Sequence, residues 1–145
     1  MQIQIKKLRA DAVVPQYQTE HSAGMDVCAA LDVPITLAPM QRQIVPCGFS
    51  MAIPEGYEVQ VRARSGLAAK NGIGLVNGVG TIDADYRGEL GVIVINYSDT
   101  DFVINPGDRI AQIVVAKYER TTWQEVEELG ETARGSGGFG STGTT

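Results

Sequence analysis

Basic side chains, cysteine, aromatic rings and long apolar runs are all scarce in this chain of 145 residues. Twelve Lys and Arg residues against seventeen Asp and Glu residues give a net charge of −5, which argues against a protein that wraps a nucleic-acid backbone. No apolar run approaches the ~20 residues that cross a membrane, and the first residues lack the apolar core of a signal peptide. We therefore expect no nucleic acid and no membrane among the partners, and a cytoplasmic location.

The two cysteines are too few for a disulfide framework, and neither has a metal-ligand companion nearby in the sequence. We expect Cys28 and Cys47 to be inert thiols. His21 is the only histidine and is a poor candidate for a catalyst, because it stands in a polar loop. With 43% hydrophobic and 20% charged residues, the composition is that of one ordinary globular domain.

Apolar and polar residues alternate with a period of two in several segments, which is the pattern of half-buried β-strands. The alternation is clear in residues 57–63 and in a shorter segment around Ile3 and Ile5, whereas residues 90–97 and 110–116 are runs rich in β-branched residues bounded by Gly, Asp or Pro. Proline, glycine and asparagine punctuate the intervals between them. Many short strands with regular turn signals predict an all-β sandwich or barrel.

Helical periodicity is rare. Residues 67–70 can form one helical turn, and Thr122 with Glu125 matches a capping box. Because Gly130 leaves this second segment room for less than two turns, we predict an extended arm there rather than a helix.

Asn77 and Gly78 predict a tight hairpin, because a type I′ turn needs positive φ at both of its central residues. The tip of such a hairpin exposes backbone N–H and C=O groups that can read the edge of a small planar ligand. The carboxylate side chain of Asp83 follows, and then the flat ring of Tyr86. This combination indicates an enzyme for a nucleotide-like substrate, although on these residues alone an acidic surface turn is the simpler interpretation.

The last part of the chain is rich in glycine, which makes up six of the fourteen residues 130–143. Such a segment does not recover its ordering entropy by itself, so we expect a tail that is mobile when free and orders over a ligand. Gly135 to Gly140 formally matches the dinucleotide pattern G-x-G-x-x-G, but only five residues follow it, so there is no room for the helix that this pattern requires. A Walker A loop is also excluded, because no Gly-Lys-Ser/Thr is present.

Five stretches carry polar residues that a plain β-sandwich does not require. They are Ala23-Gly-Met-Asp26, Arg64-Ser-Gly-Leu-Ala68, Gly80-Thr-Ile-Asp83-Ala-Asp-Tyr86-Arg-Gly88, Gly107-Asp-Arg-Ile-Ala-Gln112 and Arg134-Gly-Ser-Gly-Gly-Phe139-Gly-Ser-Thr142-Gly143. In order and spacing they resemble the five motifs of the trimeric deoxyuridine triphosphatases. The resemblance covers nearly the whole chain, from Ser22 to Thr142.

The resemblance implies an all-β, jelly-roll-like protein with little helix, in which residues 1–133 form the β domain and residues 134–145 a flexible tail that closes over the active site. It implies a homotrimer with active sites shared between subunits. The implied reaction is hydrolysis of dUTP to dUMP and pyrophosphate, by attack of water on the α-phosphorus, with Mg²⁺ bound to the triphosphate. Such a reaction limits uracil in DNA and supplies dUMP for thymidylate synthesis.

The resemblance also assigns roles to residues, and no side chain is expected to bind the metal directly. Asp83 would activate the attacking water. Asp26 would reach the metal through water, or serve a purely structural purpose. Uracil and deoxyribose would be contacted by Asn77, Thr81, Ile82, Tyr86 and Gly91, with the Tyr86 ring excluding a 2′-hydroxyl group.

The phosphates would be held from two sides. The residues of the β domain implied here are Arg64, Ser65, Gly66 and Gln112. Those of the tail are Arg134, Phe139, Gly140, Ser141 and Thr142. Within the tail, Arg134 and the two hydroxyl groups would grip the γ-phosphate, while Phe139 would stack on uracil.

Two alternatives compete with hydrolysis of dUTP. A dCTP deaminase on the same fold would need a glutamate in the third motif, where this chain has Ile82-Asp83-Ala-Asp85. A nucleotide-responsive binding protein would bind dUTP tightly without turnover, and the presence of Asp83 argues against it. Ammonia release and pyrophosphate release distinguish these possibilities.

Overall fold

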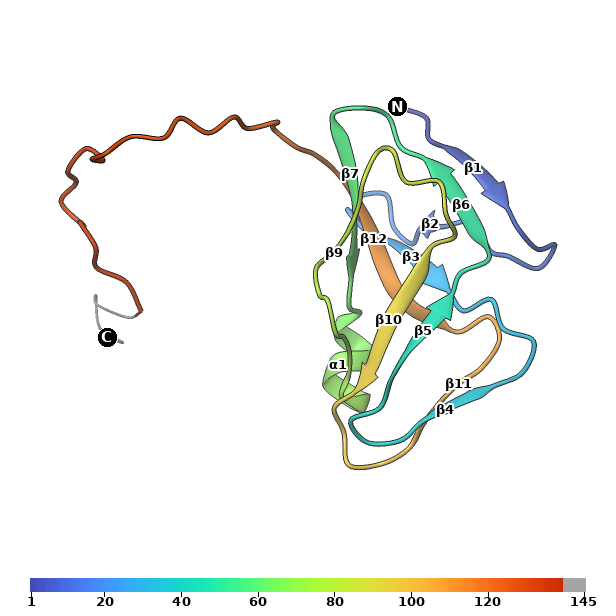
Figure 1. Cartoon of the computed structure of the whole chain (residues 1–145). Coiled ribbons are helices and arrows are strands. Elements are labelled where there is room, and N and C mark those ends of the chain that lie inside the picture. Colours follow the sequence, from blue (N-terminus) through green and yellow to red (C-terminus); the bar gives the residue numbers. More distant parts are fainter. Residues whose placement is uncertain (140–145) are drawn as a thin grey trace.

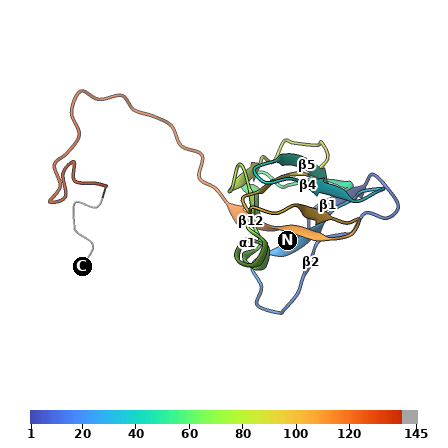
Figure 2. The same ribbon diagram turned by 90° about the horizontal axis from the view of Figure 1, so that it is seen from below.

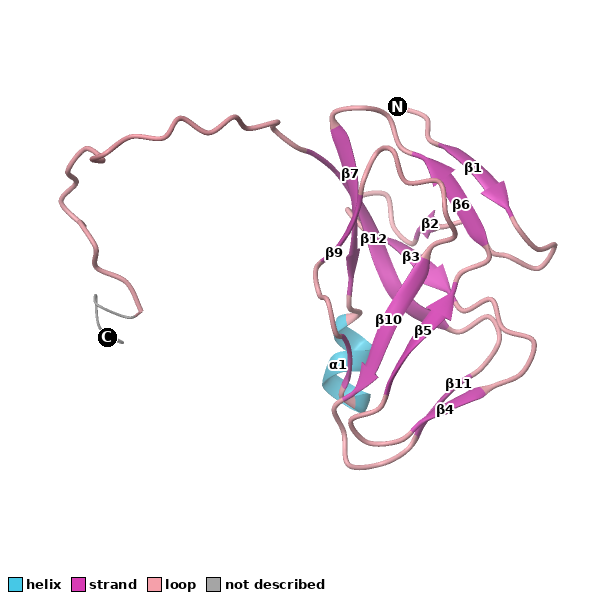
Figure 3. Ribbon diagram, in the orientation of Figure 1, coloured by secondary structure: helices cyan, strands magenta, loops and turns pink. Residues whose placement is uncertain are grey.

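The computed structural model describes residues 1–139 of the chain, and almost all of the regular structure in them is β (Figure 3). The strands are β1 (Gln4–Lys7), β2 (Gln16–Tyr17), β3 (Met25–Cys28), β4 (Ile35–Leu37), β5 (Arg42–Pro46), β6 (Phe49–Ala52), β7 (Tyr57–Arg62), β8 (Ile73–Leu75), β9 (Gly80–Ile82), β10 (Gly91–Asn96), β11 (Phe102–Ile104) and β12 (Arg109–Lys117). The one helix among the described residues is α1 (Ser65–Asn71). The predicted all-β, jelly-roll-like fold is confirmed.

The strands form a five-stranded sheet in the order β2-β3-β12-β7-β9 and a three-stranded sheet in the order β5-β10-β8, with the pairs β1-β6 and β11-β4 beside them. Every pairing is antiparallel. Figure 2 shows β5 and β12 in separate layers. The long central strand β12 pairs with β3 on one side and with β7 on the other, so it aligns residues that are far apart in the sequence.

The core lies between the sheets. It is formed by side chains that point inward from alternate positions of the strands. Val59 and Val61 point inward from β7, and Val92 and Val94 point inward from β10. Side chains at i and i+2 lie on one face of a strand, so the residues between them face outward. Ile93, between the two inward valines of β10, is only partly buried. Phe49 is the largest fully buried side chain.

The predicted type I′ hairpin at Asn77-Gly78 is wrong. The strand before the turn, β8, pairs with β10, whereas the strand after it, β9, pairs with β7. Neither Asn77 nor Gly78 has the positive φ that a type I′ turn requires. The turn instead carries the chain from one sheet to the other, because each flanking strand adds to the edge of a longer strand.

The helix is longer than the single turn predicted at residues 67–70. It begins at Ser65 and ends at Asn71, and it is capped by Gly72, which has a left-handed φ of 65° and donates its N–H to the carbonyl of Ala68 at 3.1 Å. Arg64 occupies the N-cap position without a side-chain cap. The backbone amides at this end therefore have no side-chain acceptor.

Residues 118–139, which we call the arm, leave the body after β12 and contain no helix or strand (Figure 1). At its start, the Tyr118 N–H donates to the carbonyl of Gly56 at 3.2 Å and so ties the arm to the body. The predicted extended conformation of residues 122–130 is confirmed. No helix among residues 1–139 is long and apolar enough to cross a membrane.

Candidate active site

Two groups of the predicted site residues lie at opposite ends of β7. The first group contains Asp26, on β3, and Gln112, on β12, which are direct partners in the sheet. Gln112 is also opposite Arg62 at the end of β7, and its amide donates to the carbonyl of Ala63 at 3.1 Å. The backbone approaches closely here, because a Cβ on Gly24 would collide with the Gln112 amide oxygen.

Asp26 joins two arginines in this first group. Its Oδ1 accepts a hydrogen bond from Arg64 Nε at 3.1 Å, and its Oδ2 accepts one from Arg109 Nη1 at 3.1 Å. Arg64 also donates from Nη1 to the backbone carbonyl of Arg109 at 3.1 Å. With its side chain 14% exposed, Asp26 is the least exposed member of this cluster. One partly buried carboxylate thus orients two cations that lie beside the start of α1.

Arg109 was not predicted as a site residue, and a local irregularity explains its position. Residues three apart in a regular strand face opposite sides of the sheet, so Arg109 and Gln112 should not share a face. The β3–β12 pairing shifts register between Arg109 and Ala111, however, and this bulge turns Arg109 toward Asp26.

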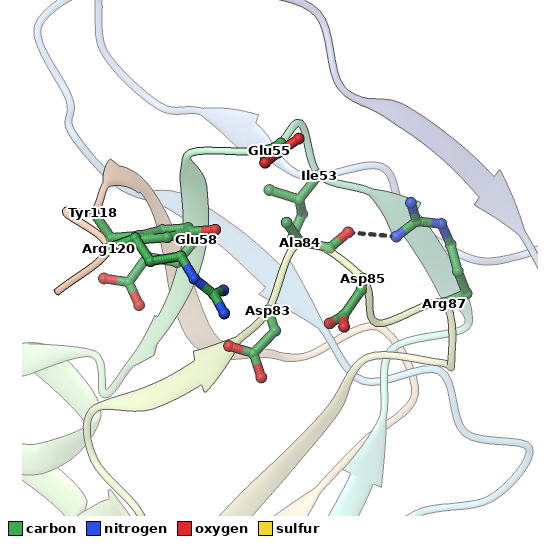
Figure 4. Close-up of a pocket in the computed structure, with 9 residues that line it drawn as sticks. All are labelled: Ile53, Glu55, Glu58, Asp83, Ala84, Asp85, Arg87, Tyr118 and Arg120. Carbon is green, nitrogen blue, oxygen red and sulfur yellow. Dashed lines mark hydrogen bonds between the residues drawn. The ribbon is translucent and has the colours of Figure 1, made fainter. Parts of the chain in front are cut away.

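The second group surrounds Asp83, which follows the end of β9. Ile82 is opposite Val59 in the β7–β9 pairing, so Asp83 lies level with Glu58 near the start of β7. The carbonyl of Asp83 accepts a hydrogen bond from the Tyr86 N–H at 3.1 Å, which folds the chain into a turn. Asp83, Asp85 and Arg120 line an open hollow of about 580 Å³. Figure 4 shows Asp83 beyond the end of its strand, with the side chains of Asp85 and Arg120 near it.

A smaller pocket of about 200 Å³ adjoins Asp83 and contains most of the predicted uracil and sugar contacts. It is lined by Thr81, Ile82, Asp83, Tyr86, Glu89, Leu90 and Gly91. A Cβ on Gly91 would come within 2.8 Å of the Ile44 side chain, so β10 lies close against Ile44 of β5 at this point. Asn77 does not line this pocket; its amide lies over Gly80.

Glu89 lines this pocket and was also missed by the sequence analysis. Its carboxylate accepts a hydrogen bond from the N–H of Gly48 at 2.8 Å, and its backbone carbonyl accepts one from the Tyr86 hydroxyl at 3.0 Å. Gly48, the partner of the Glu89 carboxylate, is 41 residues away in the sequence, so no local pattern indicates this contact.

The two groups are far apart within one chain. Six residues of extended chain separate Glu58, beside Asp83, from Arg64, and at about 3.3 Å per residue this corresponds to roughly 20 Å. The candidate base and the candidate phosphate-binding arginine therefore do not meet in a single subunit.

The tail residues contact neither group where the structure describes them. Arg134 donates only to the nearby carbonyl of Gly137 at 2.8 Å, and Phe139 is fully exposed. Gly140, Ser141 and Thr142 lie outside the described residues.

Burial affects the thiols of both cysteines. Burial raises the pKa of Cys47 to about 12 and also raises the pKa of Cys28, so both thiols are poor nucleophiles near neutral pH. Among residues 1–139, no group of three or more His, Cys, Asp or Glu side chains is arranged to hold a metal ion.

Comparison with known proteins identifies the family. The deoxyuridine 5′-triphosphate nucleotidohydrolase of Rickettsia bellii is 58% identical over 143 residues, which cover 98% of this chain and 95% of that protein. The solved structure of the Staphylococcus bacteriophage 80alpha dUTPase with dUPNHPP aligns with a TM-score of 0.90 at 27% identity, over 99% of both chains. A variant of the dUTPase from phage phi11 of S. aureus, whose structure is described as revealing the coordination of a structural Mg(II) ion, shares the fold at 24% identity, with a TM-score of 0.81 over 90% of this chain and all of that one.

The family model for dUTPase matches residues 10–143, which include both groups of site residues. The match and the sequence identity to a curated relative extend over almost the whole chain. The chain therefore belongs to the dUTPase family.

Proposed function

We propose that this protein hydrolyses dUTP to dUMP and pyrophosphate by attack of water on the α-phosphorus. Membership of the dUTPase family supports the reaction. One observation supports the assignment of this reaction to particular residues. This is the pocket in which a carboxylate, Asp83, and a flat ring, Tyr86, lie side by side next to main-chain groups. A cytoplasmic location for the enzyme stays a prediction.

Asp83 acts as the base that orients and deprotonates the attacking water. Its side chain is exposed at the pocket rim, where water has access to it. Aspartate is a weak base, so much of the rate enhancement must come from holding water and phosphorus in line.

Thr81, Ile82 and Gly91 present main-chain groups and a tight wall to uracil. Cytosine would reverse two hydrogen-bond partners on its pairing edge, and groups left unpaired in this way are discriminated against strongly. The Tyr86 ring packs on the deoxyribose and leaves no space for a 2′-hydroxyl group. Asn77 contributes its amide from the adjoining turn.

The triphosphate binds to Arg64, Gln112 and the free amides of Ser65 and Gly66. Mg²⁺ suits this site as an ion carried by the substrate, because it keeps several waters and binds phosphates with one or two carboxylates rather than a protein cage. Both oxygens of Asp26 already accept hydrogen bonds from arginines, so a water-mediated contact is the one that this carboxylate can offer. The ion would neutralise phosphate charge and fix the conformation of the triphosphate.

Homotrimers with shared active sites are the second part of the proposal. The separation of roughly 20 Å between Asp83 and Arg64 along β7 supports an arrangement in which another copy supplies one of the two groups. The arm supports the same arrangement: Trp123 is 94% exposed and Leu129 is 87% exposed, which is unusual for large apolar side chains. Their burial against a neighbouring copy would direct residues 134–145 toward that copy's pocket.

Pyrophosphate release with Mg²⁺ tests the reaction, with dUTP compared against dCTP, dTTP and UTP. We expect rapid release from dUTP alone. Tight binding of dUTP without release would indicate a nucleotide-responsive binding protein, and release of ammonia from dCTP would indicate a deaminase.

Mixed assemblies test the shared site directly. Asp83→Asn and Arg64→Ala chains, each inactive alone, are co-expressed with different tags and the mixed species is purified. If the two groups come from different copies, the purified mixed trimers should show about a third of the parent activity, because each of them contains one intact site out of three. No recovery in assemblies that contain both chains would overturn the shared site.

Two measurements accompany this experiment. Light scattering should give three times the 15.5 kDa mass of one chain, and a monomer would contradict the trimer. A chain that ends at Ala133 should remain trimeric but lose turnover, whereas full activity would show that the tail takes no part in the reaction.

A further inference from the structure

We propose that Glu89 is a positioning residue that holds the Tyr86 ring in place and thereby sets the selection of deoxyribose over ribose. The inference rests on the proposed contact between Tyr86 and the sugar. It concerns a different residue and a different element, namely the turn between β5 and β6, which lies outside the pocket.

A chain of hydrogen bonds runs from that turn to the Tyr86 ring. The N–H of Gly48 donates to the Glu89 carboxylate at 2.8 Å, and the Tyr86 hydroxyl donates to the Glu89 carbonyl at 3.0 Å. The ring lies directly over Gly88, where an added Cβ would collide with the Tyr86 hydroxyl. The orientation of the ring is therefore fixed by the backbone at residues 88 and 89.

The turn that anchors Glu89 is rigid. Gly48 is buried with a left-handed φ of 75°, and a Cβ there would lie 2.8 Å from Ala12 and 2.9 Å from Ala30. Two further hydrogen bonds tie the turn to Leu90, one from Cys47 N–H to the Leu90 carbonyl and one from Leu90 N–H to the Phe49 carbonyl, both 2.9 Å long. Because Ala12, Ala30 and Arg9 pack closely against Gly48 and two hydrogen bonds hold the turn to Leu90, we expect the turn to stay in place if the loop moves.

The Glu89 carboxylate is the partner of a buried donor, although most of the residue is exposed. A buried backbone N–H that loses its acceptor is destabilising, so the Gly48 amide favours the loop conformation that brings Glu89 to it. Without the carboxylate, the remaining hydrogen bonds of residues 84–89 lie within residues 83–89, such as those from Arg87 Nη1 to the carbonyls of Ala84 and Tyr86, and Ala84 alone still packs against the core. The ring then gains freedom to move away from the sugar, and a 2′-hydroxyl group is admitted.

The experiment compares kcat/KM for UTP and dUTP in Glu89→Ala, Glu89→Gln and Asp99→Ala. In Glu89→Ala we expect the ratio of UTP to dUTP activity to rise about tenfold, the size of one lost charge-assisted hydrogen bond. Glu89→Gln retains an acceptor oxygen and should restore most of the discrimination. Asp99, exposed in the loop at the opposite end of β10, is the matched acidic control and should leave the ratio unchanged.

A merely structural role for Glu89 would lower the melting temperature and the dUTP activity while leaving the ratio unchanged, and that result would overturn the inference. Tyr86→Ala separates this failure from failure of the proposed function. If Tyr86→Ala leaves the ratio unchanged, the ring does not contact the sugar and the proposed role of Tyr86 is wrong. If Tyr86→Ala raises the ratio and Glu89→Ala does not, only the inference about Glu89 is wrong.

Discussion

The two groups of site residues at the ends of β7 are held in place by different kinds of interaction. Around Asp83 the pocket is shaped by the backbone: a turn closed by Tyr86 N–H, a glycine against Ile44, and one carboxylate that caps a buried amide. Around Asp26 the structure is held by ion pairs, in which one carboxylate orients Arg64 and Arg109. A backbone-built pocket favours discrimination between similar shapes, whereas a cluster of oriented cations favours strong binding of an anion.

Removal of the Asp83 charge should have the largest effect of any single change. In Asp83→Asn we expect turnover to fall by about 10²–10⁴-fold, the usual contribution of a general base, while dUTP affinity stays nearly constant. Single-turnover pyrophosphate release and calorimetric binding measure the two quantities separately. Asp85→Asn, in the same loop, is the control, and an equal loss of turnover in both variants would contradict the assignment of Asp83 as the base.

Substitution in the cationic group should weaken binding instead. Arg64 uses Nε toward Asp26 and Nη1 toward the Arg109 carbonyl, and lysine cannot reproduce both contacts. We expect Arg64→Lys to raise KM for dUTP by about tenfold or more with a smaller change in kcat, since it removes binding to phosphate rather than the base.

Arg62→Lys is the matched control, because Arg62 is exposed and contacts only the Gln60 side chain. If Arg62→Lys raises KM as much as Arg64→Lys does, the effect belongs to overall charge and not to the Asp26 cluster.

Ionic strength should affect the two groups of site residues differently, and we expect this effect to be smaller than that of the substitutions. Raising the ionic strength from about 0.05 M to 0.5 M shortens the screening length to a few ångströms, so we expect KM for dUTP to rise about threefold. The ratio of dUTP to UTP activity should stay constant, because the backbone-built pocket reads shape. A change in that ratio with salt would show that the sugar is selected electrostatically.

The sequence predicts the strands better than it predicts the cluster of site residues around Asp26. The reason is physical. The alternation in residues 57–63 predicts one strand, because burial of one face acts locally on every second residue, and the β-branched residues of 90–97 predict another. The cluster of Asp26, Arg64 and Arg109 depends on the β3–β12 register and on a bulge, which no local pattern encodes.

The errors have the same origin. Asn77-Gly78 has the local preference for a hairpin, but the edges of β7 and β10 recruit the two flanking strands separately. Glu89 is likewise invisible in the sequence, because its partner Gly48 becomes a neighbour only when the sheets pack.

The smallest predicted effect concerns Cys47, which lies in the turn that anchors Glu89 and so reports on the rigidity of the backbone-built group. Burial raises its pKa from the ordinary value of 9.0 to about 12, with smaller contributions from Cys28 and Glu89. The folded state therefore holds the proton more tightly than the unfolded state, so this contribution to stability is complete below pH 9 and is lost as the pH rises toward 12. In a Cys28→Ala background, iodoacetamide should modify Cys47 only slowly at pH 8, and Glu89→Ala should increase the rate by releasing the turn. Rapid alkylation of the folded parent would mean that the turn opens readily, and a turn that opens readily does not fix the Tyr86 ring.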